Sequence, residues 1–147
     1  MIHRFGARSH RKDRRGTAAV EFAVMAPFLI LLVFGMLEVG RALMVQHLLT
    51  NAVRDGARSA TLESATAGEV EAQVASYLAA SSVPGATVTV DPMDLTTAAP
   101  GDPVTVTASV PFDTVNWLPS SFFLEGATLD ATMVMRRETS TSTYTEP

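Results

Sequence analysis

The 147-residue chain contains no cysteine. This absence excludes disulfide scaffolds, thiolate metal sites and cysteine nucleophiles, and it leaves the redox compartment open. The three histidines, His3, His10 and His47, form no metal-ligand spacing with one another or with a carboxylate. The sequence also lacks G-x-S-x-G, P-loop and G-x-G-x-x-G motifs. We therefore expect no catalytic residue, metal, cofactor or small-molecule substrate, and we interpret the chain as the substrate of an enzyme rather than as an enzyme.

Positive charge is scarce after residue 15. Residues 1–15 carry six basic side chains against Asp13 alone, a net charge of +5, whereas the chain from Gly16 onward has five arginines and fourteen acids. A basic head can bind nucleic acid. This one has no aromatic residue beyond Phe5 and directly precedes an apolar segment. Retention in the cytoplasm is therefore the better interpretation, and nucleic acid is not an expected partner.

The apolar segment, residues 17–37, reads "TAAVEFAVMAPFLILLVFGML" and contains one charge. As a helix it would cover about 31 Å, close to the roughly 30 Å of a hydrocarbon core. Pro27 removes one helical hydrogen bond, which membrane helices tolerate. The basic head predicts a cytoplasmic N-terminus, with everything after Glu38 outside. A cleaved signal peptide is the alternative, but the apolar run is long and no good Ala-x-Ala site follows it.

Glu21 is the charged residue of this segment. A carboxylate at the centre of a membrane helix costs on the order of 2.5–3.5 kcal/mol, and such a residue usually has a functional partner. Glu21 lies four residues past Thr17, about 6 Å inside the segment, where water and lipid head groups still reach it. Taken alone, Glu21 is therefore interpreted as an interfacial acid that mildly shortens the span.

The residues around Glu21 form a longer pattern. Basic residues are followed by Gly16, by a small neutral residue, by glutamate and Phe22 at the fifth and sixth positions after the glycine, and by an apolar run. This pattern resembles the processing signal of type IV prepilin-like proteins. The resemblance implies that a prepilin peptidase in the membrane cuts between Gly16 and Thr17 and removes a basic leader, residues 1–16.

The same resemblance gives Glu21 a partner and a role in assembly, together with Phe22. Cleavage would free the α-ammonium of Thr17, on the same subunit or a neighbouring one. In a low dielectric that pairing is far stronger than in water, so it would hold stacked subunits in register. A glycine at the cut would let the bare backbone enter the peptidase groove, where a Cβ atom would clash.

A second resemblance extends over about residues 15–60. The motifs "AVEFA" at 19–23, "FGMLEVGR" at 34–41 and "NAVRDGAR" at 51–58 resemble the TadE-like family, the minor pseudopilins of tight-adherence (Flp) pilus systems. This implies a single-pass protein of the bacterial cytoplasmic (inner) membrane that takes part in pilus assembly. Other pilins, pseudopilins and pilus assembly proteins would be its partners, in the membrane or in the pilus itself.

A permanently anchored binding module is the alternative function. Its outer domain would recognise an envelope component or a partner protein. A mere anchor needs neither Gly16 nor Glu21, so these two residues favour the pilin-like interpretation.

Residues 38–60 predict that the helix continues to about Ala60, softly interrupted at Gly35 and Gly40. The apolar face would hold Val45, Leu48, Leu49, Ala52, Gly56 and Ala60, and the polar face His47, Thr50, Asn51, Arg54, Asp55 and Arg58. Glu38 and Arg41 mark the outer membrane boundary; termination of the span is their expected role, and subunit contact is the alternative. Both Glu38 with Arg41 and Asp55 with Arg58 have the i,i+3 spacing of ion pairs worth about 0.2–0.5 kcal/mol each.

The remaining sequence predicts an α+β fold. After a polar break, "EVEAQVASYLAASS" predicts a second amphipathic helix, with Val70, Val74, Tyr77 and Leu78 on one side. Residues 86–91, 102–112 and 127–138 alternate apolar and polar side chains, as strands do. We therefore expect residues 61–138 to form a small extracytoplasmic domain in which this helix packs on a roughly three-stranded antiparallel sheet.

Three further segments have simpler interpretations. Trp117, Phe122 and Phe123 are expected to plug the core of the domain, although an adhesive loop is the alternative. The acids of "DPMD", residues 91–94, lack the rest of an EF-hand loop, so an exposed turn is preferred to a calcium site. Residues 139–147 are predicted to be a polar tail.

Overall fold

The computed structural model describes residues 13–119 and 121–138 of the chain. The basic leader before residue 13 and the polar tail lie outside these residues. The chain divides into two compact units, Met1–Leu37 and Glu38–Pro147. Helix α1, Asp13–Ala60, contributes to both units, and each unit is described by itself.

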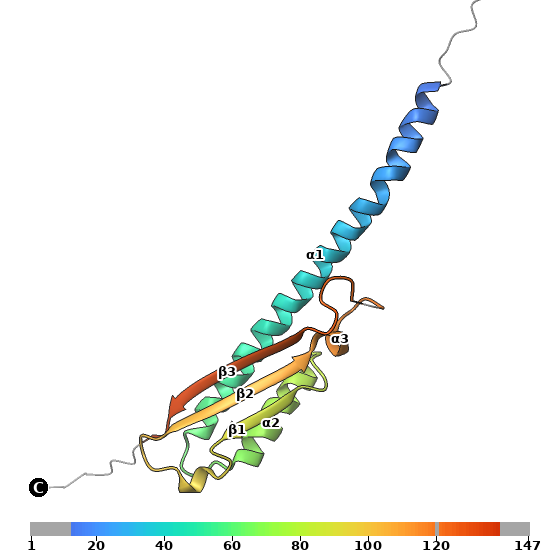
Figure 1. Cartoon of the computed structure of the whole chain (residues 1–147). Helices are drawn as coiled ribbons and strands as arrows, with labels where there is room; N and C mark the ends of the chain where they lie inside the picture. The colour runs from blue at the N-terminus through green and yellow to red at the C-terminus, as the bar shows by residue number, and fades with distance from the viewer. Residues whose placement is uncertain (1–12, 120, 139–147) are drawn as a thin grey trace, which may run out of the picture. The chain divides into compact units, whose positions relative to one another are not determined.

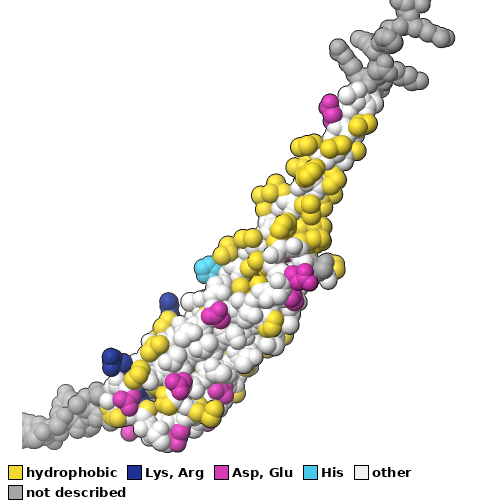
Figure 2. Space-filling view, viewed as in Figure 1, with side chains coloured by type: hydrophobic (Ala, Val, Ile, Leu, Met, Phe, Trp, Pro, Cys, Tyr) yellow, Lys and Arg dark blue, Asp and Glu magenta, His cyan; other side chains and the backbone are white. Residues whose placement is uncertain are grey.

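The described part of the first unit is the apolar half of α1. From Gly16 to Leu37 its side chains are mostly exposed, including Val20, Phe28 and Leu32, and Figure 2 shows hydrophobic side chains crowded along it. In the described part of the chain, α1 is the helix long and apolar enough to cross a membrane by length and composition. A helix that is apolar on all sides needs an apolar medium around it.

The predicted continuation of the helix to Ala60 is confirmed, but the predicted interruptions are wrong. Helix α1 runs through Gly35 and Gly40 without a break, contains Pro27, and begins at Asp13, four residues before Thr17. A glycine inside a helix costs only about 1 kcal/mol relative to alanine. The good helix formers on both sides of Gly35 and Gly40 offset that cost.

The second unit contains the α+β fold that the sequence predicts. After α1 come α2 (Ala67–Ala80), β1 (Thr87–Asp91), the short 3-10 helix η1 (Leu95–Thr97), β2 (Pro103–Pro111), α3 (Phe112–Val115) and β3 (Thr128–Arg136). The strands form an antiparallel sheet in the order β1-β2-β3. Val90 pairs with Val106, and Val106 with Met133, so apolar side chains line up across one face. Figure 1 shows the strands beside α2 and the second half of α1.

One face of the sheet carries the core, and both long helices pack against it. The buried side chains of β2 alternate strictly along the strand, as a sheet with one covered face requires. The core consists mainly of Val45, Leu49, Ala52, Val53 and Ala57 from α1, Val70, Val74 and Leu78 from α2, and Val104, Val106, Ala108 and Val110 from β2. The predicted apolar face of residues 38–60 is thus confirmed, except that Leu48 is only half-buried.

Gly56 sets how closely the two helices approach. A Cβ atom added there would lie 2.4 Å from Cγ2 of Val74 and 3.6 Å from Cγ1 of Val106. No side chain other than hydrogen fits that space, because real Cβ atoms do not approach other atoms so closely. The glycine in "NAVRDGAR" therefore has a packing reason.

Both ends of α2 are capped by side-chain or backbone hydrogen bonds. Thr66 and Glu69 form a reciprocal capping box at the N-terminus. At the C-terminus, the N–H of Val83 donates to the carbonyl of Leu78 at 2.9 Å, and Ser82 adopts a left-handed φ of 63°. Serine thus occupies the position where glycine is usual.

Two packing predictions are wrong. Trp117, Phe122 and Phe123 do not plug the core; they are 67%, 48% and 60% exposed. The large buried side chains are instead Phe112, Leu49 and Leu78. Tyr77, expected on the buried side of α2, is 46% exposed. Phe112 directly follows the last core-facing stretch of β2, so it reaches the core, whereas the loop carrying the other aromatics leaves it.

Candidate functional site: the processing segment and the Glu38 corner

The four predicted processing and assembly residues lie on the first part of α1. Gly16, Thr17, Glu21 and Phe22 are all helical and exposed. Thr17 and Glu21 are four residues apart, so they lie on the same face of the helix, one above the other. A Cβ atom at Gly16 would meet nothing within 4 Å. Packing among the described residues therefore gives no reason for glycine at this position, although glycine weakens the helix.

Glu38 is charged and fully buried at the start of the second unit. Its carboxylate accepts hydrogen bonds from three successive backbone N–H groups: that of Phe122, that of Phe123 at 2.9 Å and that of Leu124 at 3.3 Å. Charge-assisted bonds of this kind are roughly twice as strong as neutral ones. A side chain of α1 thus holds a loop that lies more than eighty residues away in the sequence.

Arg41 holds the neighbouring chain segments from the same helix. Its Nε donates to the carbonyl of Val115 at 2.8 Å and its Nη2 to the carbonyl of Ser82 at 2.6 Å. The guanidinium also lies 4.7 Å from the centroid of the Trp117 ring, in cation–π contact. Burial lowers the pKa of Arg41 from its ordinary value, but an arginine stays charged.

The expected i,i+3 ion pairs are not formed by these described residues. Glu38 and Arg41 bond to separate partners rather than to one another. No ion pair joins the exposed side chains of Asp55 and Arg58 either. For Glu38 and Arg41, the reason is competition, because buried backbone groups that would otherwise lack a partner take up both charges.

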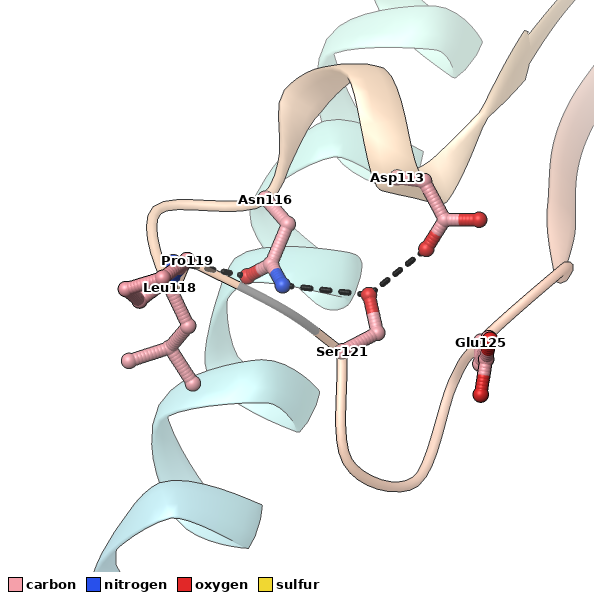
Figure 3. A pocket seen from close by; sticks show the side chains of 6 residues that line it. All are labelled: Asp113, Asn116, Leu118, Pro119, Ser121 and Glu125. Carbon is pink, nitrogen blue, oxygen red and sulfur yellow. Dashed lines mark hydrogen bonds between the residues drawn. The ribbon is translucent and has the colours of Figure 1, made fainter.

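Helix α3 and the loop after it enclose a shallow pocket of about 420 Å³. We call the described residues 116–119 and 121–126 the aromatic loop. Figure 3 shows Asp113 accepting a hydrogen bond from Ser121 Oγ, at 2.7 Å, and Asn116 Nδ2 donating to the same oxygen at 3.1 Å. Asp113 also accepts from the N–H of Gly126 at 3.1 Å. The network braces the aromatic loop, and these donors, Ser121 first, lower the pKa of Asp113.

The sequence analysis did not predict that Glu38 and Arg41 bind other segments of the folded domain. It singled out Glu38 and Arg41 by their place after the apolar run, but gave neither a partner in the folded domain. The available signal was the pair of charged residues on the buried side of a helix, since such residues are almost never fully buried unless paired. The identity of the partners depends on the path of the chain.

The described residues contain no cluster of side chains with metal-binding geometry. Across residues 13–119 and 121–138, no group of three or more His, Cys, Asp or Glu side chains is placed to hold a metal ion. The acids of residues 91–94 have a local role instead, because Asp94 caps η1 by accepting from the N–H of Thr96 at 3.0 Å.

Together, these described elements define a class: proteins with a candidate membrane-spanning helix near the N-terminus and an α+β domain later in the chain. Residues 16–58 match the family model described as TadE-like protein. The predicted resemblance to the TadE-like family is thereby confirmed over this segment, which includes Gly16, Glu21, Glu38 and Arg41. No curated protein and no solved structure matches the chain.

Proposed function

We propose that this protein is a processed minor pseudopilin that takes part in the assembly of a tight-adherence (Flp) pilus. The TadE-like match of residues 16–58 and the single apolar helix fit a membrane protein of a pilus system. The role of processed minor pseudopilin is inferred from the residues around the expected cut. In this role the chain is a substrate of prepilin peptidase and not an enzyme.

The observation that carries this proposal is the open space around Gly16. The residue is helical, exposed and unconstrained by packing, yet glycine costs a helix about 1 kcal/mol relative to alanine. Gly56, by contrast, is required by the close approach of Val74. Gly40 is equally open, so it is the place of Gly16 at the expected cut that points to a requirement from outside the folded chain, such as passage of bare backbone through a peptidase groove.

The position of Glu21 supports a role after cleavage. Its carboxylate is exposed on the face of α1 that also carries Thr17. A new α-ammonium at Thr17 would supply a cation at the depth of this acid. A paired charge in a membrane fixes the axial register of neighbouring helices even where its net stabilisation is small, and Phe22 adds an apolar contact beside it.

The proposed topology rests on the basic head. With a net charge of +5 before residue 16, the N-terminus stays in the cytoplasm and the domain lies outside the inner membrane. Glu38 and Arg41, which follow Leu37, then mark the outer boundary of the span. Their burial against the aromatic loop suits this position, since neither charge has to enter the hydrocarbon core.

The test is the N-terminus of the mature protein. Envelope fractions from cells with an active prepilin peptidase are analysed by mass spectrometry for the wild type, Gly16→Val and Gly40→Val. Gly40 is the matched control, because it is also a glycine of α1 with nothing within 4 Å of an added Cβ. We expect the wild type and Gly40→Val to begin at Thr17, and Gly16→Val to keep its leader.

An intact wild-type chain beginning at Met1, with the peptidase active on another prepilin, would contradict the proposal. That result would favour the permanently anchored binding module. Retention of the leader in Gly40→Val as well would show that valine disturbs the helix rather than the cut.

A further inference from the structure

The aromatic loop presents large apolar side chains to its surroundings although the domain has a complete core. Trp117, Phe122 and Phe123 are each about half or more exposed. Between Asn116 and Leu124 the sequence "NWLPSSFFL" carries no charged residue. Large apolar side chains exposed together in one uncharged segment can mark a surface that meets an apolar partner.

Four backbone N–H groups of this loop already have hydrogen-bond partners within the domain. The N–H groups of Phe122, Phe123 and Leu124 donate to Glu38, and the N–H of Leu118 donates to Asn116 Oδ1 at 3.2 Å. Moving an unsatisfied amide out of water is expensive. A loop with these four groups already bonded can enter a less polar medium at much lower cost.

The loop is also tied to the point where the chain leaves the apolar segment. Glu38, which binds its backbone, is the residue directly after Leu37, the last residue of the span. The three hydrogen bonds to Glu38 therefore keep Phe122 and Phe123 within a few ångströms of that boundary. Tryptophan and other aromatic side chains favour the interface between head groups and acyl chains.

We propose that the aromatic loop is a second membrane-contact site, which inserts Trp117, Phe122 and Phe123 into the lipid interface of the outer leaflet. The inference rests on α1 crossing the membrane, as in the proposed function. It adds that the domain itself touches lipid and is thereby held at a defined height. Continuity with the span and the absence of charged residues between Asn116 and Leu124 favour lipid over a second protein.

The loop contains the chain's single tryptophan, so the intrinsic fluorescence of the full-length protein reports on this site alone. The protein is reconstituted into vesicles, and protease protection verifies that α1 is inserted. Emission is then compared in unlabelled lipid, in lipid brominated near the head group and in lipid brominated deep in the acyl chain. We expect emission shifted to the blue, with strong quenching by the shallow bromine and weaker quenching by the deep one.

Phe123→Ser tests the contribution of the neighbouring ring, and Met93→Ser is the matched control. Met93 is 85% exposed. It lies two residues after Asp91, the last residue of β1. Asp91 pairs with Thr105 of β2, at the end of the sheet away from the loop. We expect Phe123→Ser to reduce quenching of Trp117 by about half or more, because transfer of a phenylalanine from water is a large part of the driving force. Met93→Ser should leave quenching unchanged.

Three outcomes would overturn the proposal. Emission typical of water and unaffected by either bromine, with α1 inserted, would reject the loop as a lipid contact and leave the proposed function intact. A blue shift that grows with the protein-to-lipid ratio, without quenching by either bromine, would indicate that the loop contacts another copy of the protein. Failure of α1 to insert would reject both the membrane-contact site and the proposed function.

Discussion

At the scale of single residues, two buried charges organise the corner of the domain next to the span. Glu38 accepts hydrogen bonds from three backbone N–H groups. Arg41 donates to two backbone carbonyls and contacts the face of the Trp117 ring. Each charge replaces water with several fixed partners, which is the condition for burying it. Loss of either side chain would leave buried polar groups without partners.

Glu38→Ala should therefore loosen the aromatic loop. We expect the domain to lose about 1–3 kcal/mol, the cost of leaving buried donors unsatisfied, and the amides of Phe122–Leu124 to exchange with solvent much faster. Hydrogen exchange of the full chain in detergent measures this directly. Glu38→Gln, which keeps one acceptor oxygen, should lose less, and Glu63→Gln, an exposed acid, should behave as the wild type. Unchanged protection of these amides in Glu38→Ala would show that Glu38 does not hold the loop.

Asp113 makes the stability of the aromatic loop depend on pH. Its pKa lies below the ordinary value of 3.8 because the carboxylate accepts hydrogen bonds from Ser121 and from the N–H of Gly126. A lowered folded pKa means that the stabilisation is present above the ordinary value and is lost as the pH falls through the lowered one.

We expect the Gly126 amide resonance, followed by NMR between about pH 5 and pH 2, to move with a midpoint below the ordinary pKa of an aspartate. Asp113→Asn should abolish this transition. Asp91→Asn, at the other end of the sheet, should preserve it. A wild-type midpoint at or above the ordinary value would show that the Ser121 and Gly126 hydrogen bonds do not favour the charged form.

At the scale of elements, the packing of α1 on α2 depends on the missing side chain of Gly56. Gly56→Ala gains about 1 kcal/mol of helix propensity but places a Cβ atom 2.4 Å from Val74 Cγ2. Overpacking of a full core costs about 1–3 kcal/mol, and valine cannot turn away easily, since its χ1 is stiff. The difference between these two effects is a net destabilisation of up to about 2 kcal/mol, which urea unfolding would measure.

The matched control is Gly68→Ala, on α2, where an added Cβ atom meets nothing. That variant should be as stable as the wild type or slightly more so. Val74→Ala should recover part of the loss in the Gly56→Ala background, because it removes the atom that clashes. Additive losses in the double variant would place the clash elsewhere.

At the scale of the whole molecule, the proposed function predicts assembly through Glu21. Glu21→Gln should leave processing and insertion intact but lower the yield of crosslinked oligomers several-fold, because the amide cannot form an ion pair with the α-ammonium of Thr17. Glu21→Leu should do the same while inserting more easily.

The control is the same comparison in the Gly16→Val background. An unprocessed chain has no α-ammonium at Thr17, so the Glu21→Gln substitution should then have no further effect on oligomer yield. Equal yields in the wild type, Glu21→Gln and Glu21→Leu would mean that Glu21 is only an interfacial acid.

The sequence predicts the two long helices and the three strands, since these follow from local periodicity, but it does not predict η1 or α3. The three predicted strands differ from β1, β2 and β3 by no more than two residues at either end, and the end of α1 at Ala60 was predicted correctly. Alternation along a strand and three- or four-residue steps along a helix are set by which face of one segment is covered. Neither pattern depends on which other segment covers that face.

Which distant residues meet depends on how the chain folds in three dimensions. The tertiary structure assigned Phe112 to the core and left Trp117, Phe122 and Phe123 exposed, although all four are aromatic and close in sequence. It also joined Glu38 to backbone groups 84 to 86 residues away. Such contacts depend on α3, which directly follows β2. There the chain leaves the sheet, and its side chains lose the alternation that distinguishes core from surface.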